Sequence, residues 1–446
     1  MVKMGGLETD LYQLTMAAGY FQAGKVNEIA TFELFVRRLP ASRNYLIAAG
    51  LQQAVEYLLN LSFTEDEIRF LRGLPQFAQA PPGFFELLSR LRFTGDLDAV
   101  PEGTPVFEGE PLLRVRAPII EAQIPETYLL ATINFQTAVA TKASRLAEAA
   151  GSRAVVEFGT RRAHSPAAGI LAGRAAYIGG STGTSNVEAG LRFGIPVFGT
   201  AAHSWVQSFA SELEAFRQLQ RLLGPNTVYL IDTYDTIEGA RLAASLGSPL
   251  WGVRLDSGNL FELSRAVRGI LDAAGLAGAR IMATGDLNEY KILELAAAKV
   301  PIDAFGVGAE LATSADAPAI GGVYKLVELE ANGEKRHTAK LSPEKHTMPG
   351  AKQVFRYPRH DEIACDWEQP LPGGRALLQP VLRGGRLMQA LPAASQAREY
   401  CRTALAELPK KYLSLFAPDE PYPVRYTAAQ HALLTEIRRR LAGSRL

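Results

Sequence analysis

The stretch that decides the fold is residues 157–204, EFGTRRAHSPAAGILAGRAAYIGGSTGTSNVEAGLRFGIPVFGTAAHS. Three short apolar segments, residues 154–158, 175–178 and 195–198, each run into a polar or glycine-rich cluster, and stretches of helix-forming length separate the clusters. This order predicts a strand, a functional loop and a helix, repeated. Three such loops would line one end of a parallel sheet.

Five more apolar segments follow the same pattern, at residues 227–231, 250–255, 280–284, 303–307 and 323–329. Helical patterns lie between several of them. A (β/α)8 barrel needs eight parallel strands with crossover helices, and each unit takes roughly 20–30 residues. We therefore predict an α/β fold with an irregular (β/α)8-type barrel, and a doubly wound open sheet is the alternative.

The rest of the chain predicts elements on both sides of this barrel. Residues 9–24 indicate a helix, 30–39 an alternating strand, 43–61 a second helix, and Thr64 with Glu67 a capping box. Short strands with repeated Pro and Gly at residues 97–119 predict a small β-rich side domain, and residues 124–151 a long helix. We expect an N-terminal helical and β-rich domain (1–135), the α/β barrel with the active site (136–347), and a C-terminal extension (348–446) that completes the β-rich domain and ends in helices.

Composition limits the classes of function. Lys plus Arg (47) nearly balances Asp plus Glu (46), so no long-range field favours nucleic acid or a membrane, and we expect neither as a partner. Cys365 and Cys401 have no metal-ligand or CxxC spacing and are expected to be reduced, buried thiols. No apolar run approaches ~18 residues and the first residues lack a signal-peptide core, which predicts a cytoplasmic protein.

Glycine loops after three successive late strands suggest a phosphate-rich ligand. They are DSG at 256–258, TGD at 284–286 and GVG at 306–308. Small residues leave backbone N–H groups free to bind phosphate, and the late strands of barrels commonly hold one. This favours TGD and GVG for a monophosphate and DSG for another part of the ligand. Asp-Ser-Gly alone is also an ordinary turn and helix cap.

Two other loops offer reactive or charged side chains. His203, in a loop after residues 195–198, could act as a base, a phosphate ligand or a phosphoryl acceptor. Arg161 or Arg162, after residues 154–158, could fork a carboxylate or phosphate. Adjacent residues near a strand end point in opposite directions, so only one of the two arginines is expected to face the site.

These motifs together resemble the nicotinate phosphoribosyltransferases, which are type II phosphoribosyltransferases. The segments that carry the resemblance span about three quarters of the chain: TDLYQLTM (9–16), RRLPASRNYLIAAGL (37–51), EFGTRRAHSP (157–166), GGSTGTSNVEAG (179–190), FGIPVFGTAAHSWVQSF (193–209), DTYDT (232–236), VRLDSGN (253–259), ATGDLNEYKI (283–292) and FGVGAEL (305–311). The resemblance implies transfer of ribose 5-phosphate from phosphoribosyl pyrophosphate to nicotinate. It also implies ATP hydrolysis through a phosphohistidine, Mg²⁺ with the phosphates, and a homodimer with a shared active site.

The resemblance assigns expected roles to individual positions. His203 matches the phosphorylated histidine, and the donor site matches Arg254, Asp256, Ser257 and Gly258, with Gly285, Asp286, Gly306 and Gly308 around the 5-phosphate. The base pocket matches Phe158 and Arg161, closed by Tyr12 of the neighbouring subunit, while Asp232 would assist at the ribose or metal. No metal site made of protein ligands alone is expected. One departure is Ala309, where relatives commonly have threonine after GVG.

Three alternatives stay open at this stage. Nicotinamide phosphoribosyltransferase has a similar layout, but it has an aspartate where this chain has Ser185, and that carboxylate would repel nicotinate. Quinolinate phosphoribosyltransferase is usually shorter and needs extra basic residues for a second carboxylate. A non-catalytic nucleotide-binding protein on the same scaffold would not need a phosphoryl acceptor at His203.

Overall fold

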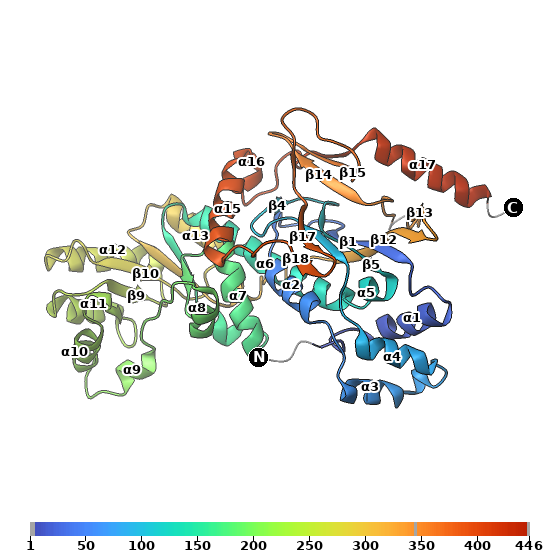
Figure 1. Ribbon diagram of the computed structural model, residues 1–446. Helices are drawn as coiled ribbons and strands as arrows, with labels where there is room; N and C mark the ends of the chain where they lie inside the picture. Colours follow the sequence, from blue (N-terminus) through green and yellow to red (C-terminus); the bar gives the residue numbers. More distant parts are fainter. Residues whose placement is uncertain (1–4, 343–345, 444–446) are drawn as a thin grey trace.

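The computed structural model describes residues 5–342 and 346–443. The chain forms two lobes, one around an antiparallel sheet and the other around a parallel sheet (Figure 1). In the colours of Figure 1, the blue N-terminal and orange C-terminal segments meet in the antiparallel lobe, and green and yellow segments build the parallel lobe. Residues far apart in the sequence therefore make up one lobe together.

The antiparallel sheet has seven strands. In spatial order they are β13 (Glu334–His337), β12 (Gly322–Ala331), β1 (Ile29–Val36), β5 (Pro111–Pro118), β3 (Asp96–Ala99), β17 (Gln379–Arg383) and β18 (Arg386–Leu387). The predicted strand at 30–39 and the β-rich unit at 97–119 are confirmed. The prediction that residues 323–329 form a barrel strand is wrong. They lie in β12, which pairs with β1, where the ring of Tyr324 stacks on Phe32 at 4.8 Å between centroids.

Helices from the N-terminal part of the chain cover this sheet. They are α1 (Leu11–Gln22), α2 (Leu51–Asn60), α3 (Glu65–Arg72), the 3-10 turn η1 (Pro75–Phe77), α4 (Pro82–Arg90) and α5 (Ile119–Gln123). The capping box of Thr64 and Glu67 is confirmed, since each side chain binds the other's backbone N–H. The helix predicted at 43–61 begins only at Leu51. Gly50 before it has a φ of 102°, and residues 46–47 form strand β2, paired with β4 (Pro105–Val106).

The long helix α6 (Glu126–Ala150) connects the two lobes. It packs against α2, β2 and β12 of the antiparallel lobe and against α7, β6, α13 and α14 of the parallel lobe. From Gln136 to Leu146 every one of its residues is buried, including Lys142 and Arg145. The orientation of the lobes is therefore set along this helix.

The parallel sheet has six strands. In spatial order they are β7 (Gly183–Thr184), β6 (Ala154–Glu157), β11 (Ala304–Val307), β10 (Arg280–Ala283), β9 (Gly252–Leu255) and β8 (Val228–Leu230). Beyond β7, Val197 makes a single bridge to Thr184. Because all pairs are parallel, the loops that follow these strands meet at one edge. The predicted α/β class and barrel-type repeat are confirmed, with six strands in place of eight among the described residues.

Helices alternate with these strands around the sheet. They are η2 (Thr160–Arg162), α7 (Pro166–Ile178), α8 (Val187–Phe193), α9 (His203–Gln207), α10 (Glu212–Leu223), η3 (Gly224–Asn226), α11 (Thr236–Ser245), α12 (Leu260–Ala273), α13 (Glu289–Ala297) and α14 (Ala309–Ala312). Figure 1 shows α10, α11 and α12 at the outer end of this lobe. Side-chain caps begin α7, α8, α10, α11, α12 and α13, which fixes where each preceding loop ends.

Besides residues 323–329, two more of the predicted barrel strands are wrong. Residues 175–178 are the last turn of α7, which begins at the Ser165 cap with Pro166 in its first position. Small residues let α7 approach α6 so closely that a Cβ on Gly179 would collide with the carbonyl oxygen of Ala140. The strand at this point of the fold is β7, within the glycine-rich segment. Residues 195–198 contribute only the Val197 bridge.

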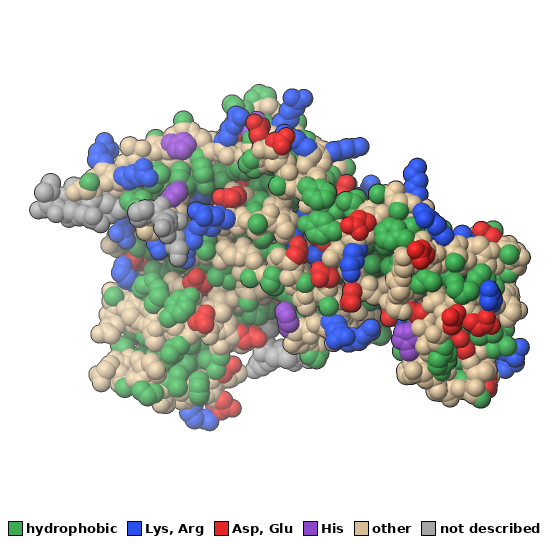
Figure 2. Space-filling model, turned by 180° about the vertical axis from the view of Figure 1, so that it is seen from behind, with side chains coloured by type: hydrophobic (Ala, Val, Ile, Leu, Met, Phe, Trp, Pro, Cys, Tyr) green, Lys and Arg blue, Asp and Glu red, His purple; other side chains and the backbone are tan. Residues whose placement is uncertain are grey.

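The C-terminal residues pack against both lobes, because Lys352–Arg356 contacts β5 and Ala394–Ala406 contacts α7. A four-stranded sheet contains β16 (Arg375–Ala376), β14 (Lys352–Arg356), β15 (Asp361–Cys365) and β19 (Val424–Tyr426), and the helices are α15 (Ala394–Ala406), α16 (Lys410–Leu413) and α17 (Ala428–Gly443). Both cysteines are free and buried, as predicted. No helix in the described part of the chain is long and apolar enough to cross a bilayer. Acidic and basic side chains are mixed over both lobes on the face drawn in Figure 2.

Candidate active site

Polar side chains converge where the parallel strands end. Arg254 lies in β9 and Asp256 directly follows this strand. An Arg254 Nη2 lies 3.3 Å from Asp256 Oδ1, and Nη1 donates to Thr200 Oγ1 in the loop before α9. The Asp256 carboxylate also accepts a hydrogen bond from Thr284 of the next strand end. Arg254 and Asp256 thus join the loops that carry Thr200, Asp256 and Thr284.

The surroundings of Asp256 favour its ionised form. Burial alone would raise the pKa of its carboxyl, but the Thr284 hydrogen bond and the charge of Arg254 hold that pKa below its ordinary value. Burial lowers the pKa of Arg254, although the carboxylates of Asp256 and Asp232 oppose this effect. A guanidinium beside an ionised carboxylate has the charges that bind polar, phosphorylated ligands.

Asp232 shapes the loop that begins at Asp256. Its Oδ2 accepts from the backbone N–H of Asp256 at 3.0 Å and from the hydroxyl of Ser257 at 2.7 Å. Its Oδ1 is buried and has no hydrogen-bond partner among the described residues. Gly258 completes the turn with a φ of 82°, which a residue with a Cβ rarely adopts. One oxygen of Asp232 thus holds the loop and the other is available to a ligand.

His203 lies beside this cluster. Its Nδ1 is 3.2 Å from the hydroxyl of Thr233, and its Nε2 is 3.7 Å from Asp256 Oδ2. The sequence pattern predicts a loop after a strand at His203, but His203 is the first residue of the short helix α9. Its side chain is 41% exposed, so a ring nitrogen can be reached from solvent while Thr233 and Asp256 orient the ring.

The glycine loops pack against the same strand ends. Gly285 has a φ of 86°, and a Cβ there would collide with the carbonyl oxygen of Asp256. Asp286, at a φ of 45°, follows it, and its carbonyl accepts from Lys291 Nζ at 2.8 Å. Gly306 lies within β11 against the ring of Phe158, and Gly308 precedes α14. These loops bring backbone close to the Asp256 cluster, as a ligand with phosphate groups requires.

Phe158 and Arg161 follow β6 at the same edge. A Cβ on Gly306 would lie only 2.5 Å from the Phe158 ring, so glycine at 306 makes the space that this ring occupies. Arg161 lies in the 3-10 turn η2 and is exposed, and its charge contributes to lowering the pKa of Arg254. Arg162 is exposed in the same turn. Both arginines lie in a 3-10 turn and not in a strand, so strand alternation does not decide which of them faces the site, and the expectation that only one does so stays a prediction.

Buried Glu157 joins the Phe158 loop to the Ser185 loop. Its carboxylate accepts from the N–H of Gly159 and from the hydroxyl of Thr184 at 2.6 Å, and its carbonyl accepts from the N–H of Ser185 at 2.9 Å. Burial raises the pKa of the Glu157 carboxyl. The side chain therefore braces two loops of the site from behind.

Several residues of this site were not singled out in the sequence. They are Thr200, Thr233, Thr284, Glu157 and Thr184; the first four bind a residue that was, and Thr184 binds Glu157. All five lie inside or beside the quoted motifs, but a threonine or a glutamate next to a loop carries no signal of its own. Only their hydrogen bonds across the loops identify them.

Tyr12 is the predicted site residue that this chain does not bring to the strand ends. It lies on α1, in the antiparallel lobe, and is 48% exposed. Figure 1 shows α1 at the opposite side of the molecule from α11 and α12. Leu11 and Met16 on the same helix are also exposed, at 43% and 38%. An exposed aromatic and apolar surface of this kind is typical of a contact with another chain.

Glu212, the first residue of α10, has a carboxyl group whose pKa is shifted by burial and by nearby acidic residues, among them Asp232. Its burial, followed by the charges of Asp235, Glu238 and Asp232, raises the pKa of its carboxyl to about 7. One of its carboxylate oxygens is buried without a hydrogen-bond partner. Among the described residues, no three His, Cys, Asp or Glu side chains are placed to hold a metal ion. Within the described part of the chain, no hydrogen-bond donor stabilises the ionised form of Glu212 at its buried oxygen.

Comparison with protein-family models matches almost the whole chain. Residues 7–134 match the nicotinate phosphoribosyltransferase N-terminal domain, residues 139–317 the quinolinate phosphoribosyl transferase C-terminal domain, and residues 351–434 the nicotinate phosphoribosyltransferase C-terminal domain. The middle match covers the parallel strands and their loops.

Curated relatives align along the chain's full architecture. The nicotinate phosphoribosyltransferase pncB2 of Mycobacterium tuberculosis is 44% identical over 94% of this chain and 91% of its own length. The nicotinate phosphoribosyltransferase of Bacillus subtilis is 40% identical over 94% of this chain and 92% of its own.

Two solved structures are similar throughout. Human nicotinic acid phosphoribosyltransferase superimposes with a TM-score of 0.84 at 28% identity, covering 96% of this chain and 99% of that one. Nicotinate-nucleotide pyrophosphorylase from Pyrococcus furiosus gives a TM-score of 0.74 at 26% identity, covering 90% and 95%.

We predict that Glu212→Gln stabilises the protein only at the higher pH values. Between about pH 4.5 and about pH 7 the folded protein keeps a proton on Glu212 that the unfolded chain has released, so the wild type loses stability as the pH rises through this window. Glutamine carries no charge and escapes the loss. Thermal unfolding should give a variant with a higher Tm at about pH 8, and a smaller difference at about pH 4.5.

The matched control is Glu214→Gln, which removes an exposed carboxylate two residues along the same helix. Its Tm difference from the wild type should not grow across this pH window. A Tm difference for Glu212→Gln that is constant with pH would contradict the raised pKa.

Proposed function

The chain belongs to the nicotinate phosphoribosyltransferase family, and from this premise we propose that it transfers the 5-phosphoribosyl group of phosphoribosyl pyrophosphate to nicotinate, coupled to ATP hydrolysis. The products are nicotinate mononucleotide and pyrophosphate, so the enzyme serves NAD biosynthesis. The observation that carries the proposal is the convergence of His203, Arg254 and Asp256 at one edge of the parallel sheet. The reaction needs a charged site that binds the phosphoribosyl donor and, next to it, a side chain that accepts a phosphoryl group.

The donor binds along the loops after β9, β10 and β11. Arg254 and Asp256 contact the ribose and pyrophosphate, together with Ser257 and Gly258. Backbone N–H groups around Gly285, Asp286, Gly306 and Gly308 hold the 5-phosphate. Support comes from the hydrogen bonds that tie these loops to each other, because an anion bound by backbone groups needs a loop of fixed shape.

Nicotinate binds over the loops after β6 and β7. The pyridine ring stacks on Phe158, and Arg161 pairs with the carboxylate. Ser185 offers a hydroxyl, which can donate a hydrogen bond to that carboxylate, so the acid is preferred to the amide. Glu157 supports both loops, and the ring nitrogen then faces the ribose carbon from which pyrophosphate departs.

His203 accepts the γ-phosphoryl group of ATP. A neutral ring nitrogen attacks the γ-phosphorus, the bond to the β–γ bridging oxygen breaks, and ADP leaves. The phosphohistidine adds about two negative charges beside Asp256 and changes how the site holds pyrophosphate. Hydrolysis of the phosphohistidine then returns His203 to its starting state, with release of inorganic phosphate.

Mg²⁺ enters with the phosphates of the substrates. The carboxylates of Asp232 and Asp256 fit this role, because hard oxygen ligands suit the ion and Asp232 Oδ1 is buried without a partner. Bound there, the ion would neutralise charge on the pyrophosphate. The protein's own part is to orient these carboxylates through Ser257 and Thr284.

The active site is shared between two copies of the chain, and Tyr12 of one closes the base pocket of the other. Support comes from the distance of α1 from the strand ends within one chain and from the exposed Leu11, Tyr12 and Met16 on that helix. The cytoplasmic location stays a prediction.

The test of the function is pyrophosphate release with nicotinate, nicotinamide and quinolinate in parallel, with and without ATP. We expect turnover with nicotinate, stimulated by ATP. Turnover with nicotinamide or quinolinate in preference to nicotinate would assign the chain to one of the alternatives, and no release with any base would favour a binding protein.

Ser185→Asp should weaken nicotinate binding. The new carboxylate would lie a few ångströms from that of nicotinate, a repulsion of roughly 1–4 kcal/mol. Ser185→Asn is the matched control, because it has the same shape without the charge. The KM for nicotinate should rise much more for the aspartate variant, and equal effects of the two variants would mean that charge at 185 is not sensed.

Mixing two variants that are each expected to lack ATP-stimulated turnover should restore it if the site is shared. A Tyr12→Ala chain and a His203→Ala chain, combined and allowed to exchange subunits, form heterodimers in which one of the two sites is intact. The expected result is a gain of ATP-stimulated turnover on mixing. Exchange demonstrated by mass spectrometry without any gain would contradict the shared site.

His203→Ala should abolish ATP hydrolysis and ATP stimulation but keep a slow, ATP-independent transfer. The loops and Arg254 that position the donor are untouched by this change. Wild-type protein incubated with γ-labelled ATP should carry an acid-labile, base-stable label that the variant lacks. His164→Ala, which removes an exposed histidine from the loop after β6, should keep the label. Equal labelling of the His203→Ala protein would place the phosphoryl group elsewhere.

A further inference from the structure

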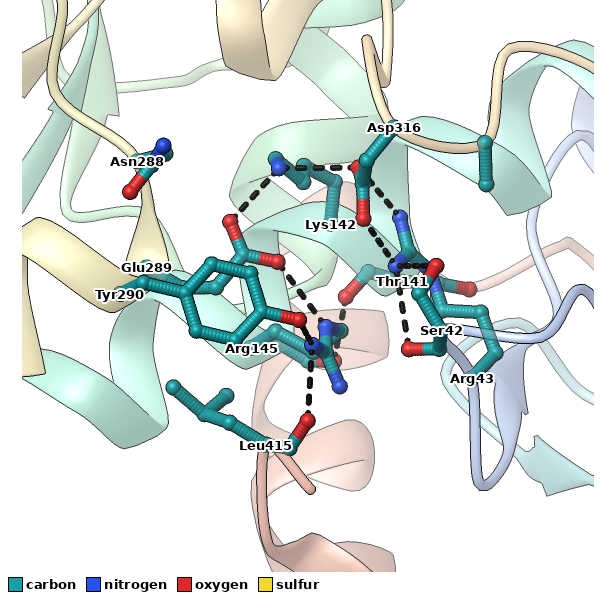
Figure 3. A network of polar contacts seen from close by, with 12 residues as sticks. Ser42, Arg43, Thr141, Lys142, Arg145, Asn288, Glu289, Tyr290, Asp316 and Leu415 are labelled. Carbon is teal, nitrogen blue, oxygen red and sulfur yellow. Dashed lines mark hydrogen bonds and ion pairs between the residues drawn. The ribbon is translucent and has the colours of Figure 1, made fainter. Parts of the chain in front are cut away.

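The buried ammonium group of Lys142 contacts three carboxylates, which lie in segments that follow strands of the parallel sheet. Lys142, near the middle of α6, has a side chain that is 1% exposed. Its Nζ lies 2.6 Å from Glu289 Oε2, 2.9 Å from Asp316 Oδ1 and 3.2 Å from Glu310 Oε2. Figure 3 shows Lys142 between Glu289 and Asp316.

The three carboxylates sit at defined places behind two glycine loops. Glu289 is the first residue of α13 and follows the TGD loop (284–286) after two intervening residues. Glu310 is the second residue of α14 and lies two positions after Gly308 of the GVG loop (306–308). Asp316 follows α14. The Lys142 ammonium is therefore a common anchor for the helices that leave both loops.

Two arginines bind two of the carboxylates that Lys142 contacts and so hold these carboxylates in place around its ammonium group. Arg145, one turn later on α6, binds the other oxygen of Glu289 at 3.0 Å, and Arg43 binds both oxygens of Asp316. Three cations thus face three carboxylates in a largely buried site. Burial would lower the pKa of the Lys142 ammonium, but Glu289 and Asp316 raise it above its ordinary value, so the charge persists.

We propose that Lys142 is a positioning residue for the donor phosphate, because it fixes the TGD and GVG loops at one distance from each other. The proposal rests on the proposed function, in which these two loops hold the 5-phosphate from opposite sides. Lys142 does not touch the substrate. It acts through Glu289 and Glu310, whose helices set where the backbone N–H groups of the loops point.

Ala309 makes the geometry of the GVG loop more important in this chain. An alanine after Gly308 has no hydroxyl, so this loop can offer the phosphate only backbone donors. Their direction depends on how α14 is held, and Glu310 is the side chain of α14 that reaches Lys142. A change at Glu310 or Lys142 should therefore act on phosphate binding more than on nicotinate binding.

The experiment compares Glu310→Gln with Lys142→Met in the full-length enzyme. Glu310→Gln removes only the link to α14, and its side chain is 34% exposed, so the variant is expected to fold. The KM for phosphoribosyl pyrophosphate should rise several-fold in Glu310→Gln and roughly tenfold or more in Lys142→Met, while the KM for nicotinate stays the same. Glu310→Asp, which keeps the charge, should recover part of the loss.

The matched control is Arg356→Met. It removes the cation of a buried pair, with Asp361 at 2.6 Å, in the four-stranded sheet. This variant should lose thermal stability as Lys142→Met does but leave both KM values unchanged. It separates a loss of stability from a loss of positioning.

Each outcome decides a different point. Selective weakening of the donor supports the proposal, and Glu310→Gln alone decides it if Lys142→Met does not fold. An unchanged donor KM in Glu310→Gln, or equal changes in both KM values, overturns it. Wild-type enzyme that releases no pyrophosphate from nicotinate and donor would instead contradict the proposed function.

Discussion

The structure depends on a buried network of charges that joins three distant parts of the chain. Lys142 and Arg145 on α6 meet Glu289 at the start of α13, and Asp316 connects Lys142 to Arg43 near the N-terminus. Arg145 also donates to the carbonyl of Leu415 near the C-terminus (Figure 3). Removing one partner of such a network leaves an uncompensated buried charge, typically at a cost of about 3–5 kcal/mol. The network therefore specifies how the two lobes and the C-terminal segment fit together.

The same charge network also positions the active-site loops. The helix that carries Lys142 and Arg145 packs on both lobes, and its partners lie directly behind the loops after β10 and β11. At the front, Asp256 accepts from Thr284 of the loop after β10, and Asp232 accepts from Ser257 of the loop after β9. The loop after β10 is therefore held from both sides, so the backbone groups that it offers to a phosphate have a defined position.

Much of the site could be predicted because its residues lie in local patterns. Asp256, Gly285 and Gly308 each follow an apolar segment of strand length, and parallel strands end at a common edge. The supporting contacts could not be predicted. Arg43 and Asp316 are 273 residues apart and Arg145 and Glu289 are 144 apart, and no periodicity in a single sequence pairs them.

The errors in the fold have the same origin. The apolar pattern of residues 175–178 fits a strand and a buried helix end equally well. These residues are helical because α7 begins at the Ser165 cap and packs closely against Ala140. Residues 323–329 form an apolar segment of strand length, but only pairing with β1 assigns them to the antiparallel sheet. Local propensity indicated the type of element for β12, and long-range packing determined its sheet.

The most direct measurement is a crystal structure with nicotinate mononucleotide bound. The account predicts the pyridine ring on Phe158, its carboxylate at Arg161, and the phosphate between the TGD loop (284–286) and the GVG loop (306–308). A nucleotide bound away from the ends of the parallel strands, or with its phosphate contacting neither loop, would contradict the central claim.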